Sequence, residues 1–175
     1  MYSLFINSNI MRKEVEICSV FCETLSRMKG EGVILLAGDP SNPMTIGWGT
    51  IGYIWGKWIF TVMVRPSRFT WSLMENSTEF TVNILGDEFT EQLSLCGTRS
   101  GRNVNKTEPC GFTLDNGIRV KTKYIRESFI HYECRILQKN TLIPGTMAPD
   151  IIRKYYPAQD FHTVYYGEIL GIFSK

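Results

Sequence analysis

NPMTIGWGTIGYIWGKWIFTVMVRPSRFT, residues 42–70, is the stretch that decides the fold predicted for this chain. It opens on an Asn-Pro turn signal and continues as a Gly-interrupted apolar segment to a turn at Gly56-Lys57. Ile59 to Val64 is an unbroken apolar run rich in β-branched residues, which is typical of a buried strand. The stretch ends in Arg65 to Thr70, which carries cations and hydroxyls just before an expected helix. A strand beside a helix start that attracts anions would suit a flat cofactor with a phosphate group.

Three other interpretations of glycine-rich or apolar segments are excluded. Residues 47–52 fit G-x-G-x-x-G, but strand and turn residues follow them, and no acid stands about 20 residues on, where a dinucleotide fold requires one. Residues 44–64 are long enough to span a membrane, yet they contain Lys57 and four glycines, so two strands and a hairpin explain them better. In residues 101–107, Asn105 replaces the glycine that a P-loop requires before its lysine.

Composition indicates one globular domain of ordinary type. The 175 residues are 43% apolar and 21% charged, and a net charge of +2 is too small to indicate nucleic acid or an anionic membrane as a partner. The N-terminal 14 residues show no signal peptide pattern. Five cysteines without a C-x-x-C motif are expected to be reduced thiols in a cytoplasmic protein, and the two histidines give no zinc-site spacing, so no metal is expected.

The N-terminal part is expected to form an amphipathic helix over Asn9 to Met28, ended by Gly30 and Gly32. Its expected apolar face comprises Val15, Cys18, Cys22, Leu25 and Met28. Cys18 and Cys22 are expected in the core, with a redox centre as the alternative.

Beyond that helix, strands cluster rather than alternate with helices. Strands are expected over residues 33–37, 78–85, 117–123, 128–137 and 162–173. Helices are expected from Ser67 or Thr70 as cap to about Asn76, from Asp87 as N-cap to Cys96, and within 144–156. Residues 97–106 hold three cations and no acid, which indicates a mobile basic loop. The pattern predicts a mainly β fold, an antiparallel barrel of about six or seven strands with short helical insertions.

Several motifs together resemble the flavin reductase-like family, which has the FMN-binding split β-barrel fold, and above all its short, flavoredoxin-like members. The most specific motifs are MTIGWG, RPSR-x-T and SGR-x-x-x-K, and HYECRIL and FHTVYYGEI follow in the same order and spacing. The resemblance covers roughly Val33 to Ile172. It implies Greek-key topology in a single domain over 1–175, with an N-terminal helical extension (1–32) and a barrel (33–173).

The resemblance also implies a set of FMN-binding residues. The flavin ring is expected against Asn42, Met44, Thr45, Ile46, Gly47, Trp48 and Gly49, and the phosphate around Arg65, Pro66, Ser67, Arg68 and Thr70 together with Ser100, Gly101 and Lys106. For Ser67, Arg68 and Thr70 the alternative is that they only cap and solvate a helix start, and Trp48 could equally be a core wall. His162 is expected beside the flavin, with a catalytic, a ring-positioning and a purely structural role all open. His131 is not selected, because a strand histidine is more often a surface or packed residue.

The function implied by the resemblance is electron transfer from NAD(P)H through bound FMN to a flavin, ferric or protein acceptor. The alternative is an FMN electron-transfer protein without efficient NAD(P)H turnover, and a third class is a module that binds another aromatic cofactor such as haem. Backbone N–H groups of Thr45 to Gly49 are expected to stabilise negative charge on a reduced flavin. The resemblance implies a homodimer with FMN near the subunit boundary, and neither nucleic acid nor membrane is expected as a partner.

Overall fold

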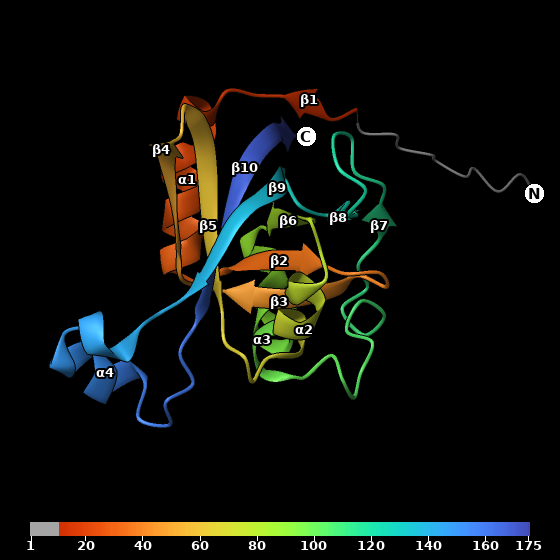
Figure 1. Cartoon of the computed structure of the whole chain (residues 1–175). Helices are drawn as coiled ribbons and strands as arrows, with labels where there is room; N and C mark the ends of the chain where they lie inside the picture. Colours follow the sequence, from red (N-terminus) through yellow and green to blue (C-terminus); the bar gives the residue numbers. More distant parts are fainter. Residues whose placement is uncertain (1–10) are drawn as a thin grey trace, which may run out of the picture.

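The computed structural model describes residues 11–175 and confirms the predicted mainly β fold (Figure 1). Eight of the described strands form one antiparallel sheet in the order β3-β2-β6-β9-β10-β5-β4, with β1 paired to β10. These strands are β1 (Lys13–Glu14), β2 (Val33–Ala37), β3 (Asn42–Ile46), β4 (Gly49–Ile54), β5 (Lys57–Val64), β6 (Glu79–Ile84), β9 (Ile130–Thr141) and β10 (Thr163–Ser174). The pairs β2–β6, β6–β9 and β5–β10 join strands distant in sequence, as the predicted Greek-key topology requires.

The helices and the remaining strands lie on the outside of this sheet. The helices are α1 (Ile17–Lys29), α2 (Phe69–Glu75), α3 (Thr90–Thr98) and α4 (Pro149–Tyr155), with two 3₁₀ turns, η1 (Asp87–Phe89) and η2 (Pro144–Thr146). A separate two-stranded ribbon consists of β7 (Leu114–Asp115) and β8 (Tyr124–Ile125). α4 projects from the body of the molecule beyond one end of β9 and β10 (Figure 1).

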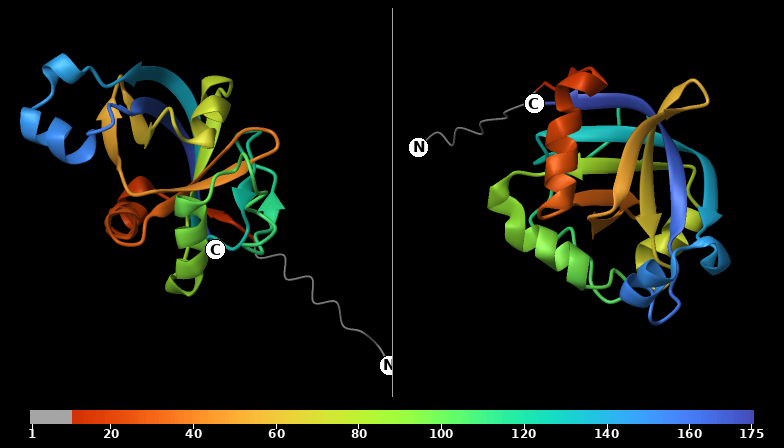
Figure 2. Two further views of the ribbon diagram at one scale, coloured as in Figure 1. Left: turned by 90° about the horizontal axis from the view of Figure 1, so that it is seen from below. Right: turned by 90° about the vertical axis from the view of Figure 1, so that its left-hand side faces the viewer.

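The sheet curls around one core, so that its two edge strands, β3 and β4, are linked by only Gly47 and Trp48. Leu35 of β2, Phe60 of β5 and Tyr165 of β10 share this core, although β2 and β5 lie far apart in the strand order. α1 contacts both β2 and β4 and runs alongside the strands at the split between the two edges (Figure 2). This arrangement places the β3–β4 corner at an opening of the barrel.

β2 is buried on both faces, which explains its continuous apolar sequence VILLA. Leu35 points into the barrel core, while Ile34 and Leu36 belong to a second apolar cluster outside the barrel. That outer cluster includes Leu93 and Cys96 of α3 and is completed by residues 110–125. α3 is thereby fixed against β2 and β3, beside the β3–β4 corner.

The N-terminal helix begins later than predicted and buries a different face. Residues 13–14 form β1 against the end of β10, and α1 starts at Ile17, while positions 9 and 10 of the predicted helix lie outside the described residues. The prediction that Cys18 and Cys22 lie in the core is wrong, because both are exposed. The buried face comprises Ile17, Val20, Thr24 and Met28, and the Thr24 hydroxyl lies 2.6 Å from the buried Tyr132 hydroxyl.

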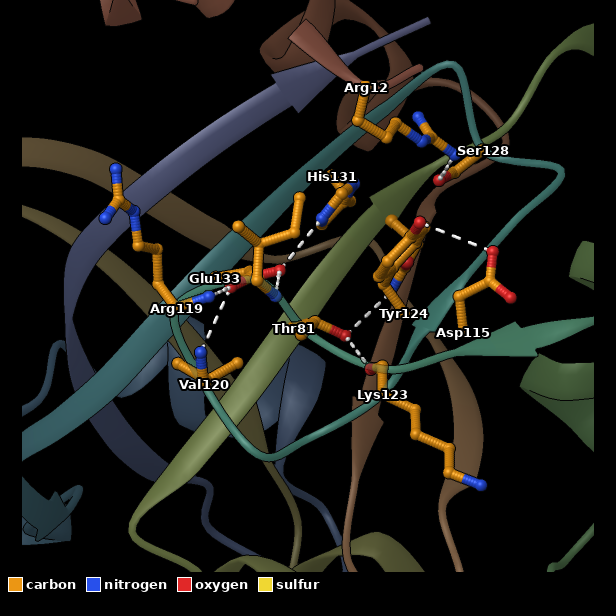
Figure 3. Close-up of polar contacts among 12 residues, drawn as sticks. Arg12, Thr81, Asp115, Arg119, Val120, Lys123, Tyr124, Ser128, His131 and Glu133 are labelled. Carbon is orange, nitrogen blue, oxygen red and sulfur yellow. Dashed lines mark hydrogen bonds and ion pairs between the residues drawn. The ribbon is translucent and has the colours of Figure 1, made fainter. Parts of the chain in front are cut away.

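The strand predicted over 117–123 is wrong, because a carboxylate captures its backbone N–H groups (Figure 3). Glu133 of β9 accepts hydrogen bonds from the N–H groups of Ile118 (2.8 Å), Arg119 (2.5 Å) and Val120 (3.1 Å). Since these N–H groups donate to a side chain, they cannot also form the hydrogen bonds of a β-ladder with a neighbouring strand. The segment therefore folds as a loop over the outer face of β9.

The predicted helix caps are also wrong. α2 begins at Phe69 with Arg68 at the cap position and no side-chain cap bond, so neither Ser67 nor Thr70 caps it. Asp87 does not cap a helix either, since it is the first residue of η1 and its carboxylate pairs with Arg27. The hydroxyls of Ser67 and Thr70 instead make tertiary contacts within the candidate site.

Candidate functional site

Several chain segments converge at the open corner of the barrel and enclose a cavity of about 280 Å³, which is called the larger cavity of the site below. They are the end of β3 with the corner after it, the end of β5 with Arg65, the residue just before α2, the last turn of α3, and the residue just before β10. The lining residues are Met44, Thr45, Ile46, Gly47, Trp48, Met63, Arg65, Arg68, Gly97 and His162.

A second, smaller cavity of about 60 Å³ shares Met44 and Arg68 with the larger one, so the two adjoin. It lies between β3, the start of α2 and the loop that follows α3. Its lining comprises Asn42, Met44, Ser67, Arg68, Phe69, Thr70, Thr98, Arg99, Ser100, Gly101 and Lys106.

The smaller cavity is positively charged, with three cations and no carboxylate in its lining. Lys106 is only 2% exposed, and its Nζ donates to the carbonyl of Cys96 at 3.2 Å. Burial lowers the pKa of Lys106, and the nearby Arg68 guanidinium adds to that effect. A buried ammonium is stabilised by a counter-charge, so this cavity is suited to an anion.

The loop after α3 is held against β3 by close packing at Gly101. A methyl group at Gly101 would lie 2.0 Å from the Asn42 amide oxygen and 2.7 Å from the Phe69 ring, so only glycine allows this approach. The Asn42 amide in turn donates to the Thr70 hydroxyl at 2.8 Å. These contacts bring the predicted residues of three separate motifs into one wall.

Arg65 and Ser67 connect the site to the segment that carries α4. The Arg65 guanidinium donates to the carbonyls of Tyr155 (2.9 Å) and Asp160 (3.1 Å) and lies 5.0 Å from the Tyr156 ring centroid. The Ser67 hydroxyl donates to the Asp160 carboxylate at 2.5 Å. The hydrogen bonds of these two side chains therefore hold residues 155–160 beside the larger cavity.

His162 is nearly buried at 7% exposure and faces aromatic neighbours. Its Nδ1 lies 2.8 Å from the Tyr156 hydroxyl, and its ring centroid lies 5.2 Å from that of Trp48. Burial lowers the pKa of His162 to about 4, and the Arg65 charge contributes in the same direction. With its pKa lowered in this way, the His162 imidazole is neutral at pH 7.

Most of the predicted site residues line one of the two cavities, and two of them line neither. Gly49 and Pro66 are absent from both linings, and Gly49 instead packs within the β4–β5 hairpin against the Thr61 carbonyl. The residues that line a cavity but were not predicted are Met63, Phe69, Gly97, Thr98 and Arg99. Met63 lies two residues before Arg65, so the period of a strand could have identified it.

The other histidine, His131, is part of the packing under the 116–123 loop (Figure 3). Its ring stacks on Tyr124 at a centroid distance of 3.9 Å, and its Nε2 lies 3.1 Å from the Glu133 carboxylate. Burial lowers the pKa of His131, although Glu133 opposes the effect. His131 is thus a packed core histidine, one of the two roles expected of it.

Two further features of residues 11–175 bear on the class of site. No helix among them has the length and apolar character needed to cross a membrane. The same residues contain no group of three or more His, Cys, Asp or Glu side chains placed to hold a metal ion.

Comparison with known proteins places most of the chain in one family. The sequence profile of the family described as flavin reductase like domain matches residues 25–174. An uncharacterized protein of Archaeoglobus fulgidus is 29% identical over 107 residues, which are 61% of this chain and 60% of that protein, so the chain matches less than two thirds of this relative's length.

Solved structures show the same fold at low sequence identity. Flavoredoxin from Methanosarcina acetivorans superposes with a TM-score of 0.64 at 22% identity, covering 100% of this chain and 76% of that chain. The NADH:FAD oxidoreductase SgcE6 of Streptomyces globisporus superposes with a TM-score of 0.62 at 16% identity, covering 86% and 81%.

Proposed function

We propose, since the chain belongs to the flavin reductase-like family, that it binds FMN with the ring in the larger cavity and the phosphate in the smaller one. The observation that carries this proposal is the buried Lys106 beside Arg68 in a lining without a carboxylate. A phosphate would supply the missing negative charge, and charge-assisted bonds to it are the strong kind.

The residues present fit such a phosphate. Lys106 and Arg68 would provide charge, while the hydroxyls of Thr70 and Ser100 would provide directional hydrogen bonds. Arg65 and Ser67 would act indirectly, because their side chains are already bonded to residues 155–160. Arg99 joins this group as a third cation of the smaller cavity.

FMN, when bound, would supply hydride and one-electron chemistry. The chain's part is to position and to exclude water. Gly47 and Trp48 lie beyond Ile46, the last paired residue of β3, so their N–H groups have no ladder partner on β2. N–H groups at this corner would stabilise negative charge on a reduced ring. His162, neutral and oriented by Tyr156, would position the ring rather than carry a proton.

The proposed activity is electron transfer from NAD(P)H through FMN to a flavin, ferric or protein acceptor. The second candidate is an FMN electron carrier without efficient NAD(P)H turnover, and it is supported by the fold likeness to a flavoredoxin as well as to an NADH:FAD oxidoreductase. Measuring NADH and NADPH oxidation with and without added flavin separates them. Turnover above the flavin-free background supports the first candidate, and its absence in a yellow, FMN-loaded protein supports the second.

A homodimer is proposed from the exposed aromatic residues of the β4–β5 hairpin. Tyr53, Trp55 and Trp58 are 65%, 58% and 42% exposed, and Trp48 at the same sheet edge lines the larger cavity. Large exposed apolar groups on one face commonly mark an interface. Sedimentation should give a dimer that Trp55→Glu weakens, and a fully FMN-loaded monomer at micromolar concentration would contradict a site near a subunit boundary.

The test of the FMN proposal is a titration of the purified chain with FMN and with riboflavin. FMN should bind roughly ten- to a hundredfold more tightly, because the two ligands differ by the phosphate alone. Equal affinities would overturn the phosphate assignment, and a haem spectrum in place of flavin absorbance would overturn the cofactor. Location in the cytoplasm remains a prediction, consistent with five free cysteines.

A further inference from the structure

We propose that Cys96 and Cys110 form a reversible intramolecular disulfide that closes the loop carrying the phosphate-binding groups. The two Sγ atoms lie 3.7 Å apart, and both side chains belong to the outer apolar cluster. Cys96 is on α3, and Cys110 follows the loop by which the chain leaves the smaller cavity. A disulfide bond of about 2 Å needs the sulfur atoms to approach by a further ~1.7 Å, a shift within reach of side-chain rotation.

The same two residues hold Lys106 from both sides through the backbone. The carbonyl of Cys96 accepts a bond from Lys106 Nζ at 3.2 Å, and the N–H of Cys110 donates to the Lys106 carbonyl at 3.2 Å. The segment between the cysteines also carries Ser100 and Gly101, which line the smaller cavity. A bond between the sulfur atoms would therefore pin both ends of the loop whose side chains are proposed to hold the phosphate.

The two thiols differ in acidity and in exposure. Burial, together with the adjacent Cys110, raises the pKa of Cys96 to about 12. Burial also raises the pKa of Cys110, but the Cys96 thiol and the Lys106 charge both oppose that increase. Cys110 is also the more accessible, at 5% exposure against 0% for Cys96. Cys110 is therefore the thiol that reacts first and Cys96 the one that resolves.

Hydrogen peroxide is the oxidant proposed, and the reaction of reduced flavin with oxygen forms it. The Cys110 thiol loses its proton to water, and its sulfur attacks one peroxide oxygen, so that an S–O bond forms as the O–O bond breaks and hydroxide leaves. The Cys96 sulfur then attacks the Cys110 sulfur, so that the S–S bond forms and the oxygen leaves as water. In total two thiols and one peroxide give one disulfide and two waters, with two electrons passing from sulfur to oxygen.

The consequence proposed is slower release of FMN, and this part rests on the proposed function. Because the sulfur atoms are already adjacent when Lys106 occupies the smaller cavity, oxidation preserves that arrangement rather than disrupting it. A loop fixed in its binding conformation retains a ligand better. We expect FMN to dissociate about three- to tenfold more slowly from the oxidised protein.

The experiment uses the full chain with FMN bound, in a Cys18→Ser/Cys22→Ser background that removes the two exposed thiols. The protein is treated with hydrogen peroxide, blocked with iodoacetamide and mapped by mass spectrometry. A cross-linked pair of peptides containing Cys96 and Cys110, reversed by dithiothreitol, is expected. Separate alkylation or over-oxidation of both residues would overturn the proposal.

Two readouts then test the loop. FMN release after dilution should slow on oxidation and recover with dithiothreitol, whereas Cys96→Ala and Cys110→Ala should show no response to peroxide. Tryptic cleavage after the exposed Arg99 and Arg102 should also slow on oxidation, and this second readout needs no flavin. If the chain binds no FMN, the proposed function fails while the cross-link and cleavage assays still decide on the disulfide. A cross-link that changes neither release nor cleavage would overturn the loop closure.

Discussion

The hydroxyl of Tyr156 lies 2.8 Å from Nδ1 of His162, and the two rings meet edge to face with centroids 5.6 Å apart. Tyr156 is itself held beneath the Arg65 guanidinium. The orientation of the imidazole beside the larger cavity is thus set by a residue of the α4 segment and indirectly by the end of β5. Substitutions of His162 and of Tyr156 are therefore expected to act on the same property, the orientation of the imidazole.

His162 is predicted to position the flavin ring. His162→Gln should weaken FMN binding roughly three- to tenfold, as expected for one lost hydrogen bond, while the reduction rate per bound FMN holds. Tyr156→Phe should show a smaller loss of the same kind. Tyr155→Phe serves as the matched control, because it also removes one tyrosine hydroxyl but keeps the ring that packs edge to face with Trp48. Rapid-mixing kinetics at saturating FMN give the measurement. Unchanged affinity with a slower reduction would instead assign hydride delivery to His162.

Stability is predicted to fall on acidification from pH 6.5 to about 4. The pKa of His162 is lowered by burial to about 4. Between pH 6.5 and 4 the unfolded state therefore binds a proton at this histidine and the folded state does not. The contribution is fully present above pH 6.5 and is lost as the pH falls toward 4, up to about 3 kcal/mol. His131 acts in the same direction. Urea denaturation across this range measures it, and His162→Gln should flatten the slope, whereas an unaltered slope would contradict the assignment.

Lys106 is predicted to discriminate FMN from riboflavin. Lys106→Met keeps the length of the side chain and removes its charge, so FMN affinity should fall roughly ten- to a hundredfold while riboflavin affinity stays unchanged. Arg102→Met is the control, because Arg102 belongs to the same loop but does not line the smaller cavity. Fluorescence titration distinguishes the two variants. Equal losses for both ligands would indicate a general disturbance of the loop and not a phosphate contact.

Glu133 is predicted to stabilise the fold without affecting the flavin. It is fully buried and receives three backbone N–H groups, so Glu133→Gln should cost about 2–3 kcal/mol of unfolding free energy. Glu79→Gln is the matched control, since Glu79 is partly exposed and accepts only the Lys121 N–H in this loop. Its cost should stay below about 1 kcal/mol. Comparable losses of unfolding free energy in the two variants would show that the burial of the Glu133 carboxylate does not contribute to stability.

Local signals were sufficient for the central part of the fold. The strand Val33–Ala37 was predicted with its observed bounds, since an apolar run between glycine-containing turns leaves little freedom. The hairpin up to Val64 was also predicted, because Gly56 marks its turn. Arg68 and Lys106, which line the smaller cavity, were also predicted, because each belongs to a motif rich in basic residues.

Features that depend on distant partners were not predictable in this way. Two faces of the first helix fit the same periodicity, and Tyr132, more than 100 residues later, selects the face that carries Thr24. Residues 117–123 alternate like a strand, yet Glu133 takes their N–H groups. The pKa of His162 is set by burial and by Arg65, neither of which is visible in its own sequence neighbourhood.

The central position of β10 has a consequence for biosynthesis. In the described part of the chain, the β4–β5 hairpin joins the rest of the sheet only through β10, and Val62 pairs with Tyr165, about 100 residues later. A ribosome that adds 5–20 residues per second needs roughly 5–20 s to bridge that interval. Throughout it the hairpin presents an unpaired edge strand and its tryptophans, a surface that other nascent chains can join. The yield of folded protein in a cell should therefore depend on whether chaperones bind this hairpin during translation, rather than on the stability of the complete barrel.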